Sequence, residues 1–459
     1  MLAGVLLLAG AVGGGSIPRS LAAAEGVLPA PFLLVVALLL FVGAAAKSAQ
    51  VPLQGWLPDA MLGPTPVSAL IHSATMVAAG VFLVARFYPL FLAAGPALAV
   101  VAWVGVATAL LGSLAALVEP DAKRTLAYST MSQLGLMFVG LGAGSLVAGL
   151  LLLVAHALYK SLLFLTVGGV EHEVEGSEFE RMGGLAYRMP GSFAASAVAA
   201  AALAGLPFTL ALPPKDPALA AAWETAYSLF AVALLASLAT ALYSARILGL
   251  VFLGPPAPAA RGAREAPPGL LLPTLTLALL LLLGGLANAA FLGYPLASLL
   301  GGEAPRVPVV TALALSVAVV GAGVGLWARR VWPEAVVWPS LRRLAPAAGS
   351  EFGLVHAYRV ATRAGLMLVG WAGLFDRGVF DRAANWLAVK ALRAVRWVGW
   401  FDLRRLDGAV CGFANGLLYL GQRVRVLQTG RIENYLLVIF LWGLAALVAG
   451  VVGSAMVGR

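Results

Sequence analysis

The chain of 459 residues is 61% hydrophobic and only 11% charged, with a mean hydropathy of +0.95, whereas soluble domains are about 25% charged. This composition excludes a soluble domain and predicts an all-α, polytopic membrane helix bundle. The net charge of +10 would suit nucleic acid, but the basic residues lie in loops between apolar stretches. We therefore attribute the charge to membrane topology and expect no nucleic-acid partner.

About eleven stretches are apolar enough to cross the bilayer, because about 20 helical residues span roughly 30 Å of hydrocarbon. In chain order they cover approximately 2–15, 30–50, 66–88, 96–118, 125–144, 146–170, 190–212, 223–251, 269–292, 307–328 and 434–457. The single cysteine, Cys411, excludes a disulfide or an iron–sulfur cluster held by this chain alone, since such clusters take about four thiolates.

The basic residues indicate how the spans are oriented. If successive spans alternate in direction, one set of loops carries Lys123, Arg124, Arg181, Arg188, Arg246, Arg261, Arg264, Arg329, Arg330, Arg342 and Arg343. The opposite set carries only Arg19, Arg86, Arg306 and Arg459. The positive-inside rule places the first set in the cytoplasm, and segment 345–430 follows the same side.

Lys47 ends an apolar run and lies five residues before Pro52. A lysine at the centre of a bilayer costs about 2.5–3.5 kcal/mol, although one near a helix end can also extend its charge to the interface. Pro52 lacks an N–H and clashes with the carbonyl of Ser48, so the sequence predicts a helix break there, with that carbonyl accepting from Lys47. Such breaks occur inside protein or beside a wet cavity, which favours an ion or proton path.

Three further groups of ionisable residues lie in or between predicted spans. His156 and Lys160 are four residues apart and share one face of a helix, so they are hard to explain as packing. Lys215 and Asp216 lie in a second proline-broken segment, 213–217, either as an interfacial loop or as a counterpart of the break near Lys47. His72 is either a relay residue or an ordinary core histidine.

Other polar groups favour simpler interpretations. Asp59 is predicted to cap the next helix. The residues His172, Glu173, Glu175 and Glu178 resemble a metal cluster in composition, but we expect them to be solvated in a cytoplasmic loop. The run G-A-G-V-G at 321–325 follows no strand, so it predicts helix packing and not a nucleotide loop.

Segment 345–430 differs from the bundle because charged and apolar residues alternate in a helical pattern, most clearly in 376–407. This pattern predicts a lateral amphipathic helix along the cytoplasmic face. About 75 residues at 1.5 Å each would extend roughly 110 Å if most of the segment is helical, and its glycines indicate either breaks or close packing. The predicted domains are therefore the bundle 1–344, the lateral helix 345–430 and a terminal anchor 431–459.

Long motifs resemble one known family. They are K-S-A-Q-V-P-L-Q-G-W-L-P-D-A-M at 47–61, G-P-T-P-V-S-A-L-I-H-S-A-T-M-V at 63–77, D-A-K-R-T-L-A-Y-S-T-M-S-Q-L-G at 121–135, H-A-L-Y-K-S-L-L-F at 156–164 and R-M-G-G-L at 181–185. The chain is similar to the antiporter-like membrane subunits of bacterial respiratory complex I, NADH:quinone oxidoreductase. The lateral segment ending L-Q-T-G-R-I-E-N-Y, with its terminal span, resembles the distal L subunits.

The resemblance implies proton translocation along buried lysines, histidines and water. It makes Lys47, His72, His156, Lys160, Lys215 and Asp216 the proton-transfer residues, with Lys160 as central carrier and Lys215 as terminal donor. It implies no cofactor here, with NADH, FMN, iron–sulfur clusters and quinone in partner subunits. The partners would be other membrane subunits held by the lateral helix, in the bacterial inner membrane.

The chain departs from the family pattern at several positions. The family has five spans and part of a sixth before the point where this chain begins, including a glutamate that pairs with the equivalent of Lys47. Leu152 stands where many relatives have a histidine, and P-P-K-D-P replaces F-S-K-D-E at 213–217. The core motifs also occur in multisubunit sodium/proton antiporters and membrane-bound hydrogenases, and a clamp that only braces its neighbours remains a further alternative.

Overall fold

The computed structural model describes residues 1–13, 28–207, 209, 212–287, 295–331, 339–341, 343, 346–347, 353–425 and 430–457. Within these ranges every regular element is a helix, apart from one isolated β-bridge between Asp121 and Glu178. The longer elements are α1 (Leu2–Ala11), α3 (Ala30–Lys47), α5 (Thr65–Ser73), α6 (Ala78–Arg86), α7 (Tyr88–Ala93), α8 (Pro96–Val118), α9 (Ala122–Gly142), α10 (Leu146–Val174), α11 (Pro190–Ala204), α12 (Leu212–Thr225), α13 (Tyr227–Phe252), α14 (Pro268–Ala287), α16 (Pro308–Val331), α18 (Leu354–Phe375), α19 (Arg382–Phe401), α20 (Asp407–Arg425) and α21 (Ile432–Val457). Short helices α4 (Trp56–Asp59) and α15 (Pro295–Leu299) and short 3₁₀ turns connect them.

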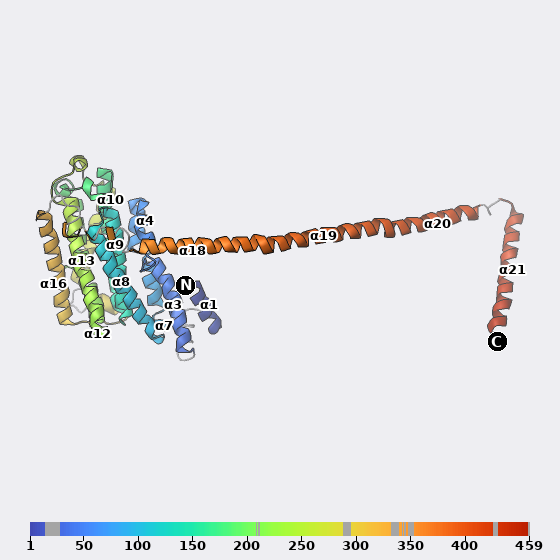
Figure 1. Cartoon of the computed structure of the whole chain (residues 1–459), viewed down its shortest axis with the longest axis horizontal. Helices are drawn as coiled ribbons and strands as arrows, with labels where there is room; N and C mark the ends of the chain where they lie inside the picture. Colours follow the sequence, from blue (N-terminus) through green and yellow to red (C-terminus); the bar gives the residue numbers. More distant parts are fainter. Residues whose placement is uncertain are drawn as a thin grey trace. The chain divides into compact units, whose positions relative to one another are not determined.

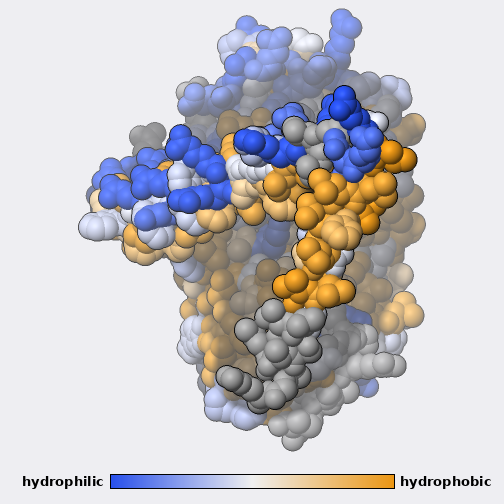
Figure 2. Space-filling model, turned by 90° about the vertical axis from the view of Figure 1, so that its right-hand side faces the viewer, coloured by the Kyte–Doolittle hydropathy of each residue, from blue (hydrophilic) through white to orange (hydrophobic). Residues whose placement is uncertain are grey.

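The predicted polytopic bundle is confirmed. Eight helical spans in the described part of the chain are long and apolar enough to cross a membrane, and α1, α9 and α11 correspond to the other three predicted spans. Exposed apolar side chains, such as Leu272 and Leu283 on α14 or Val320 and Trp327 on α16, suit contact with lipid. Figure 2 shows hydrophobic residues over much of one flank.

α9 lies in the centre of the bundle (Figure 1) and packs against α8, α10, α12 and α13. Only Arg124 of its residues is not buried, which explains why its sequence lacks an exposed polar face. Its contact with α8 depends on facing glycines, because a Cβ at Gly135 would lie 2.5 Å from the carbonyl oxygen of Gly105. Small residues let two membrane helices approach at backbone distance.

Two helices are interrupted, and neither interruption was placed correctly from the sequence. The predicted span 66–88 is two helices, α5 and α6, separated between Ser73 and Ala78. The segment 213–217, predicted as a broken segment or loop, lies inside α12. Pro213 and Pro214 are in the first turn, where a backbone N–H has no partner within the helix, and Pro217 lies within the helix. The chain breaks instead after α11, where Gly205 adopts a left-handed conformation (φ +85°) that ends the helix.

The chain forms two compact units, Met1–Arg359 and Val360–Arg459. In the second unit the helix continues from α18 through α19 and α20 (Figure 1), with π-helical turns at Asp376–Asp381 and Asp402–Leu406. Its length from 360 to 425 is about 100 Å at 1.5 Å per residue. The breaks that Gly365, Gly370 and Gly373 suggested are absent from α18. Residues 427–429 of the L-Q-T-G motif lie outside the described residues.

Candidate functional site

The centre of the candidate site is the pair His156 and Lys160 on α10. Both side chains are fully buried, in the middle of a helix of 29 residues. The Lys160 ammonium donates to the backbone carbonyl of Leu126, at 3.2 Å, and to the hydroxyl of Ser129. Both partners belong to α9, so this polar central helix supplies the acceptors for a buried charge.

His156 is held by the interruption between α5 and α6. Its Nδ1 lies 3.2 Å from the carbonyl oxygen of Ser73, the last residue of α5. Because a carbonyl only accepts, Nδ1 carries the hydrogen in this arrangement, and the other ring nitrogen of a neutral histidine is then an acceptor. That Nε2 is buried and makes no hydrogen bond within the described part of the chain. The arrangement therefore provides a base ready to take a proton.

His72 lies in the last turn of α5, immediately before the same interruption. Its side chain is fully buried, and neither ring nitrogen is hydrogen-bonded among the residues that the structure describes. Its ring centroid is 4.9 Å from that of Phe164 on α10. Buried polar atoms in native proteins nearly always have a partner, protein or water. An unpartnered histidine beside a helix break therefore favours the relay interpretation over ordinary core packing.

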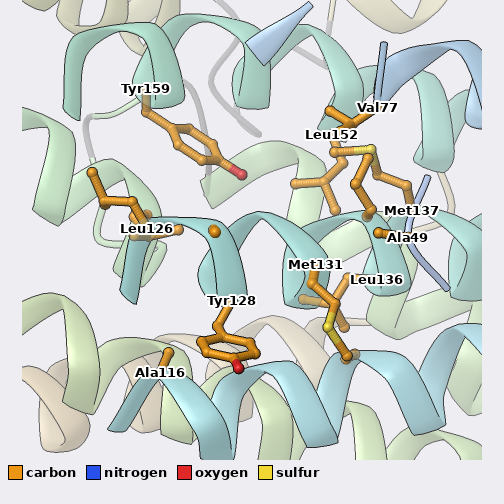
Figure 3. Close-up of a cluster of buried hydrophobic side chains, with 14 of the residues drawn as sticks. Ala49, Val77, Ala116, Leu126, Tyr128, Met131, Leu136, Met137, Leu152 and Tyr159 are labelled. Atoms are coloured by element: carbon orange, nitrogen blue, oxygen red, sulfur yellow. The ribbon is translucent and has the colours of Figure 1, made fainter. Parts of the chain in front are cut away.

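Leu152, one turn before His156, is part of the apolar core. Figure 3 shows its side chain close to Val77 and Met137, and all three are buried members of the same hydrophobic cluster. The position occupied by histidine in many relatives thus has no polar neighbour in this group. The candidate path on α10 consequently includes His156 and Lys160 but not the preceding turn.

Lys215 and Asp216 lie near the start of α12 and are both buried, which contradicts an interfacial loop. The Lys215 ammonium donates to the carbonyl of Leu203, in the last turn of α11. The Asp216 carboxylate accepts from the Thr311 hydroxyl of α16, at 2.7 Å. The two adjacent side chains therefore bind different helices, and the break after α11 supplies the acceptor for Lys215.

Lys47 is located where expected, but its surroundings differ from the prediction. It is the last residue of α3, and its side chain is exposed in this chain. The carbonyl of Ser48 accepts from the side-chain amide of Gln50, at 2.8 Å, and not from Lys47. The helix already ends before Pro52, because Ala49 has a left-handed φ of 49°. The expectation of a buried lysine bonded to a freed carbonyl was wrong.

Four of the six predicted residues form one connected group. His156 and Lys160 lie one turn apart on α10, His156 bonds to the carbonyl of the residue that follows His72, and α12, which carries Lys215, packs against α10. Asp216 belongs to this group as the sequence neighbour of Lys215, whereas Lys47 lies apart at the end of α3. The structure thus assembles a chain of titratable side chains from α5 through α10 to α12.

The buried ion pair nearest the site was not predicted from the sequence. Lys123, buried in the first turn of α9, lies 3.1 Å from the carboxylate of Glu171 on α10. Glu171 was passed over because its neighbours in the sequence suggested a solvated acidic loop. Its spacing could have revealed it, since a residue three helical turns after Lys160 lies on the same face of α10.

Two other sequence interpretations can be compared with the structure. Asp59 makes no capping hydrogen bond, so the predicted cap was wrong, and its carboxylate lies 3.6 Å from Arg124 instead. Glu173 accepts a backbone N–H from Arg264 at 2.9 Å. Among the described residues no group of three or more His, Cys, Asp or Glu could hold a metal ion.

Comparison with known proteins gives the family. The profile of the NADH:quinone oxidoreductase/Mrp antiporter transmembrane family matches residues 1–241, which is more than half of the chain. The chain belongs to this family. It is a multi-pass membrane protein, and the predicted resemblance is confirmed.

Curated relatives include quinone oxidoreductase subunits named 5 or L. The chain is 47% identical over 227 residues to chloroplastic NAD(P)H-quinone oxidoreductase subunit 5 of Physcomitrium patens, covering 48% of this chain and 32% of the relative. It is 44% identical over 220 residues to NADH-quinone oxidoreductase subunit L of Rickettsia felis, covering 48% and 34%. The chain therefore spans about a third of the length of these relatives.

Solved structures show the same fold. The Mrp complex from Dietzia sp. matches with a TM-score of 0.67 and 31% identity, over 87% of this chain and 45% of that chain. Respiratory complex I from Thermus thermophilus matches with a TM-score of 0.58 and 26% identity, over 69% and 65%. Both similarities extend beyond the region matched by the family profile.

Proposed function

We propose that this chain is a proton-translocating membrane subunit of an NADH:quinone oxidoreductase in a bacterial inner membrane. The observation that carries the proposal is the fully buried His156–Lys160 pair, which is bonded to neutral acceptors on α9 and at the α5–α6 break. The names of the sequence relatives support the same function. We place His72, His156, Lys160, Lys215 and Asp216 on the path.

The proposed mechanism is stepwise proton transfer along side chains and intervening water. His156 presents a free ring nitrogen, and Lys160 is the next group along the face of α10. Lys215 receives the proton from Lys160 and releases it to the far aqueous side, beside Asp216. We keep Lys47 as a proposed site at the end of α3, although it is exposed in this chain.

Moving a proton against the membrane potential requires an energy source. One charge moved through 100 mV costs about 2.3 kcal/mol. We propose that NADH, FMN, iron–sulfur clusters and quinone in partner subunits supply this energy. The lateral helix of the second unit would contact those neighbouring membrane subunits. We keep 1–344, 345–430 and 431–459 as the proposed functional division of the chain.

A second candidate function is ion exchange in a multisubunit sodium/proton antiporter, and the similarity to the Mrp structure favours it. A membrane-bound hydrogenase subunit is a related possibility because it shares the core motifs. The two classes differ in the driving reaction and in the ion moved. Measuring sodium uptake and proton uptake in the same liposomes, with and without NADH, separates them.

The test of the proposed function uses Lys160 in the complete complex. Lys160→Ala should abolish most proton pumping while the complex still assembles, because it removes the carrier without changing a helix contact made by small residues. Lys160→Arg should also pump poorly, since a guanidinium does not deprotonate in proteins. Arg188→Ala, at an exposed basic residue outside the proposed path and the lateral helix, is the control. Normal pumping by the arginine variant would contradict proton transfer through this side chain.

A further inference from the structure

A cavity of about 570 Å³ lies at the end of α10 that we assign to the cytoplasmic side. Its wall combines the loop Leu62–Pro66 with Lys123, Leu165, Gly168, Glu171, His172 and Leu270. Its titratable side chains are thus Lys123 from α9 and Glu171 and His172 from α10, and the lining residues of the loop and of α14 carry no charge. The proposed proton path makes no use of this cavity.

The Lys123–Glu171 ion pair joins three elements around the cavity. Lys123 Nζ lies 3.1 Å from one oxygen of Glu171 and 3.0 Å from the carbonyl oxygen of Gly63. The other oxygen of Glu171 accepts from the Thr65 hydroxyl at the start of α5. The pair therefore ties α10, which carries Lys160, to α9, which binds it, and to α5, which carries His72.

The cavity lies on the face of α10 that leads to Lys160. Glu171 follows Lys160 by eleven residues, so it lies on nearly the same face, about 16 Å away along the helix axis. Gly168 lies between them without a side chain, and a Cβ there would be 2.5 Å from Thr65 Cγ2. Phe164, one turn nearer Lys160, packs against His72. Packed side chains thus separate the cavity from His72 and Lys160.

We propose that the Lys123–Glu171 pair is the gate of a proton inlet from the cytoplasmic side to His72 and Lys160. The inference rests on the proposed function of this chain as a proton carrier. While the pair is intact, it holds the start of α5 against α10 and keeps the inlet closed. When the two side chains separate, the attraction between Glu171 and Lys123 is lost. The start of α5 then separates from Gly168 and admits water toward His72.

Thiol labelling in the complete membrane complex tests the gate directly. In a Cys411→Ser background, Ser68→Cys places a small thiol on α5 between Thr65 and His72, where the serine is buried and does not line the cavity. A membrane-impermeant maleimide is applied from the cytoplasmic side, and the labelling rate reports how often the inlet opens. Losing an ion pair worth about 1 kcal/mol corresponds to about fivefold more opening.

The expected result is that Glu171→Gln and Lys123→Gln each accelerate labelling about fivefold, while the double variant labels no faster than either. Glu173→Gln, the neighbouring carboxylate outside the cavity wall, should leave the rate unchanged. Thr65→Val, which removes one hydroxyl at nearly constant volume, should accelerate labelling in the same direction and serves if a charge variant fails to assemble.

Unchanged labelling in the Glu171, Lys123 and Thr65 variants would overturn the gate, as would equal acceleration by Glu173→Gln. The readout is independent of pumping. Gated labelling together with normal pumping by the Lys160 variants would retain the inlet and refute the proton-carrier function. Impaired pumping by the Lys160 variants, together with labelling that the gate variants leave unchanged, would retain the proton-carrier function and refute the inlet.

Discussion

The hydroxyl of Ser129 is predicted to control how long Lys160 holds a proton. Lys160 has two acceptors on α9, the Leu126 carbonyl and the Ser129 hydroxyl, and Ser129→Ala removes the second. A hydrogen bond to a charged group contributes about 1.5–3 kcal/mol, and every 1.4 kcal/mol is about tenfold in an equilibrium. The charged form of Lys160 should therefore be at least about tenfold less populated.

The fold should tolerate this substitution. Ser129→Ala deletes only one oxygen from a buried position, and the Leu126 carbonyl still accepts from the Thr130 hydroxyl at 2.9 Å. Ser132→Ala is the matched control, because Ser132 is equally buried one turn along α9 and makes no hydrogen bond to Lys160. It should assemble and pump like the parent chain.

The assay is NADH-driven acidification of sealed vesicles containing the complete complex, normalised to assembled protein on native gels. Ser129→Ala should slow the initial rate of acidification about tenfold, and Ser132→Ala by less than twofold. A Ser129→Ala complex that pumps within twofold of the parent rate would refute the role assigned to this hydroxyl. Equal impairment by the Ser132 variant would show that the effect comes from α9 packing.

Three further predictions concern stability and partners. Gly135→Ala should destabilise the bundle by about 1–3 kcal/mol, because its methyl would meet the backbone of α8, whereas Gly365→Ala has open space and should leave the melting temperature in detergent unchanged or higher. Glu265→Ala should lower that temperature by removing the acceptor of two backbone N–H groups at the start of α11, an interaction worth about 1–2 kcal/mol. The control is Glu303→Ala, at an exposed carboxylate. Equal melting temperatures for the two variants would contradict the capping of α11 by Glu265. A photocrosslinker at Trp386 on α19 should attach to neighbouring membrane subunits, and products confined to this chain would refute the proposed contact of the lateral helix.

The sequence predicted the spans well because hydropathy depends on local composition. The predicted range 96–118 coincides with α8, and the range 307–328 differs from α16 by only a few residues. A long lateral amphipathic helix was also predicted in this region, but the breaks that its glycines suggested do not occur in α18. An exposed helix tolerates isolated glycines at a cost of about 1 kcal/mol each, so they do not have to end it.

The interruption of the predicted span 66–88 could not be predicted because its backbone partners are distant in the sequence. The Ser73 carbonyl binds His156, 83 residues away, and the Val77 carbonyl accepts from the Ser48 hydroxyl at 2.7 Å. No proline or glycine lies between Ser73 and Ala78 to indicate the break. Conversely, the prolines at 213–217 indicated a break that the structure does not have at that place.

The candidate site was predicted in its residue types but not in its contacts. His156, Lys160 and Lys215 are costly to bury and were therefore conspicuous in an apolar sequence. Their backbone hydrogen-bond acceptors could not be recognised in the sequence, because backbone carbonyls are present at every position. The exposure of Lys47 was also not accessible from local sequence, since burial depends on which helices pack beside α3.

The nature of these acceptors explains how the same pocket can hold a lysine in two charge states. A buried lysine paired with a carboxylate is fixed in its charged form, because losing the proton would leave an uncompensated anion. Lys160 binds a carbonyl and a hydroxyl, and Lys215 binds a carbonyl. These acceptors stay neutral when the proton leaves, and no ion pair to either lysine occurs in the described ranges. Lys123, which does face a carboxylate, is by the same argument suited to holding a gate closed and not to carrying protons. On the proposed proton path the lysines thus bind neutral acceptors, whereas the lysine of the proposed gate binds a charged partner.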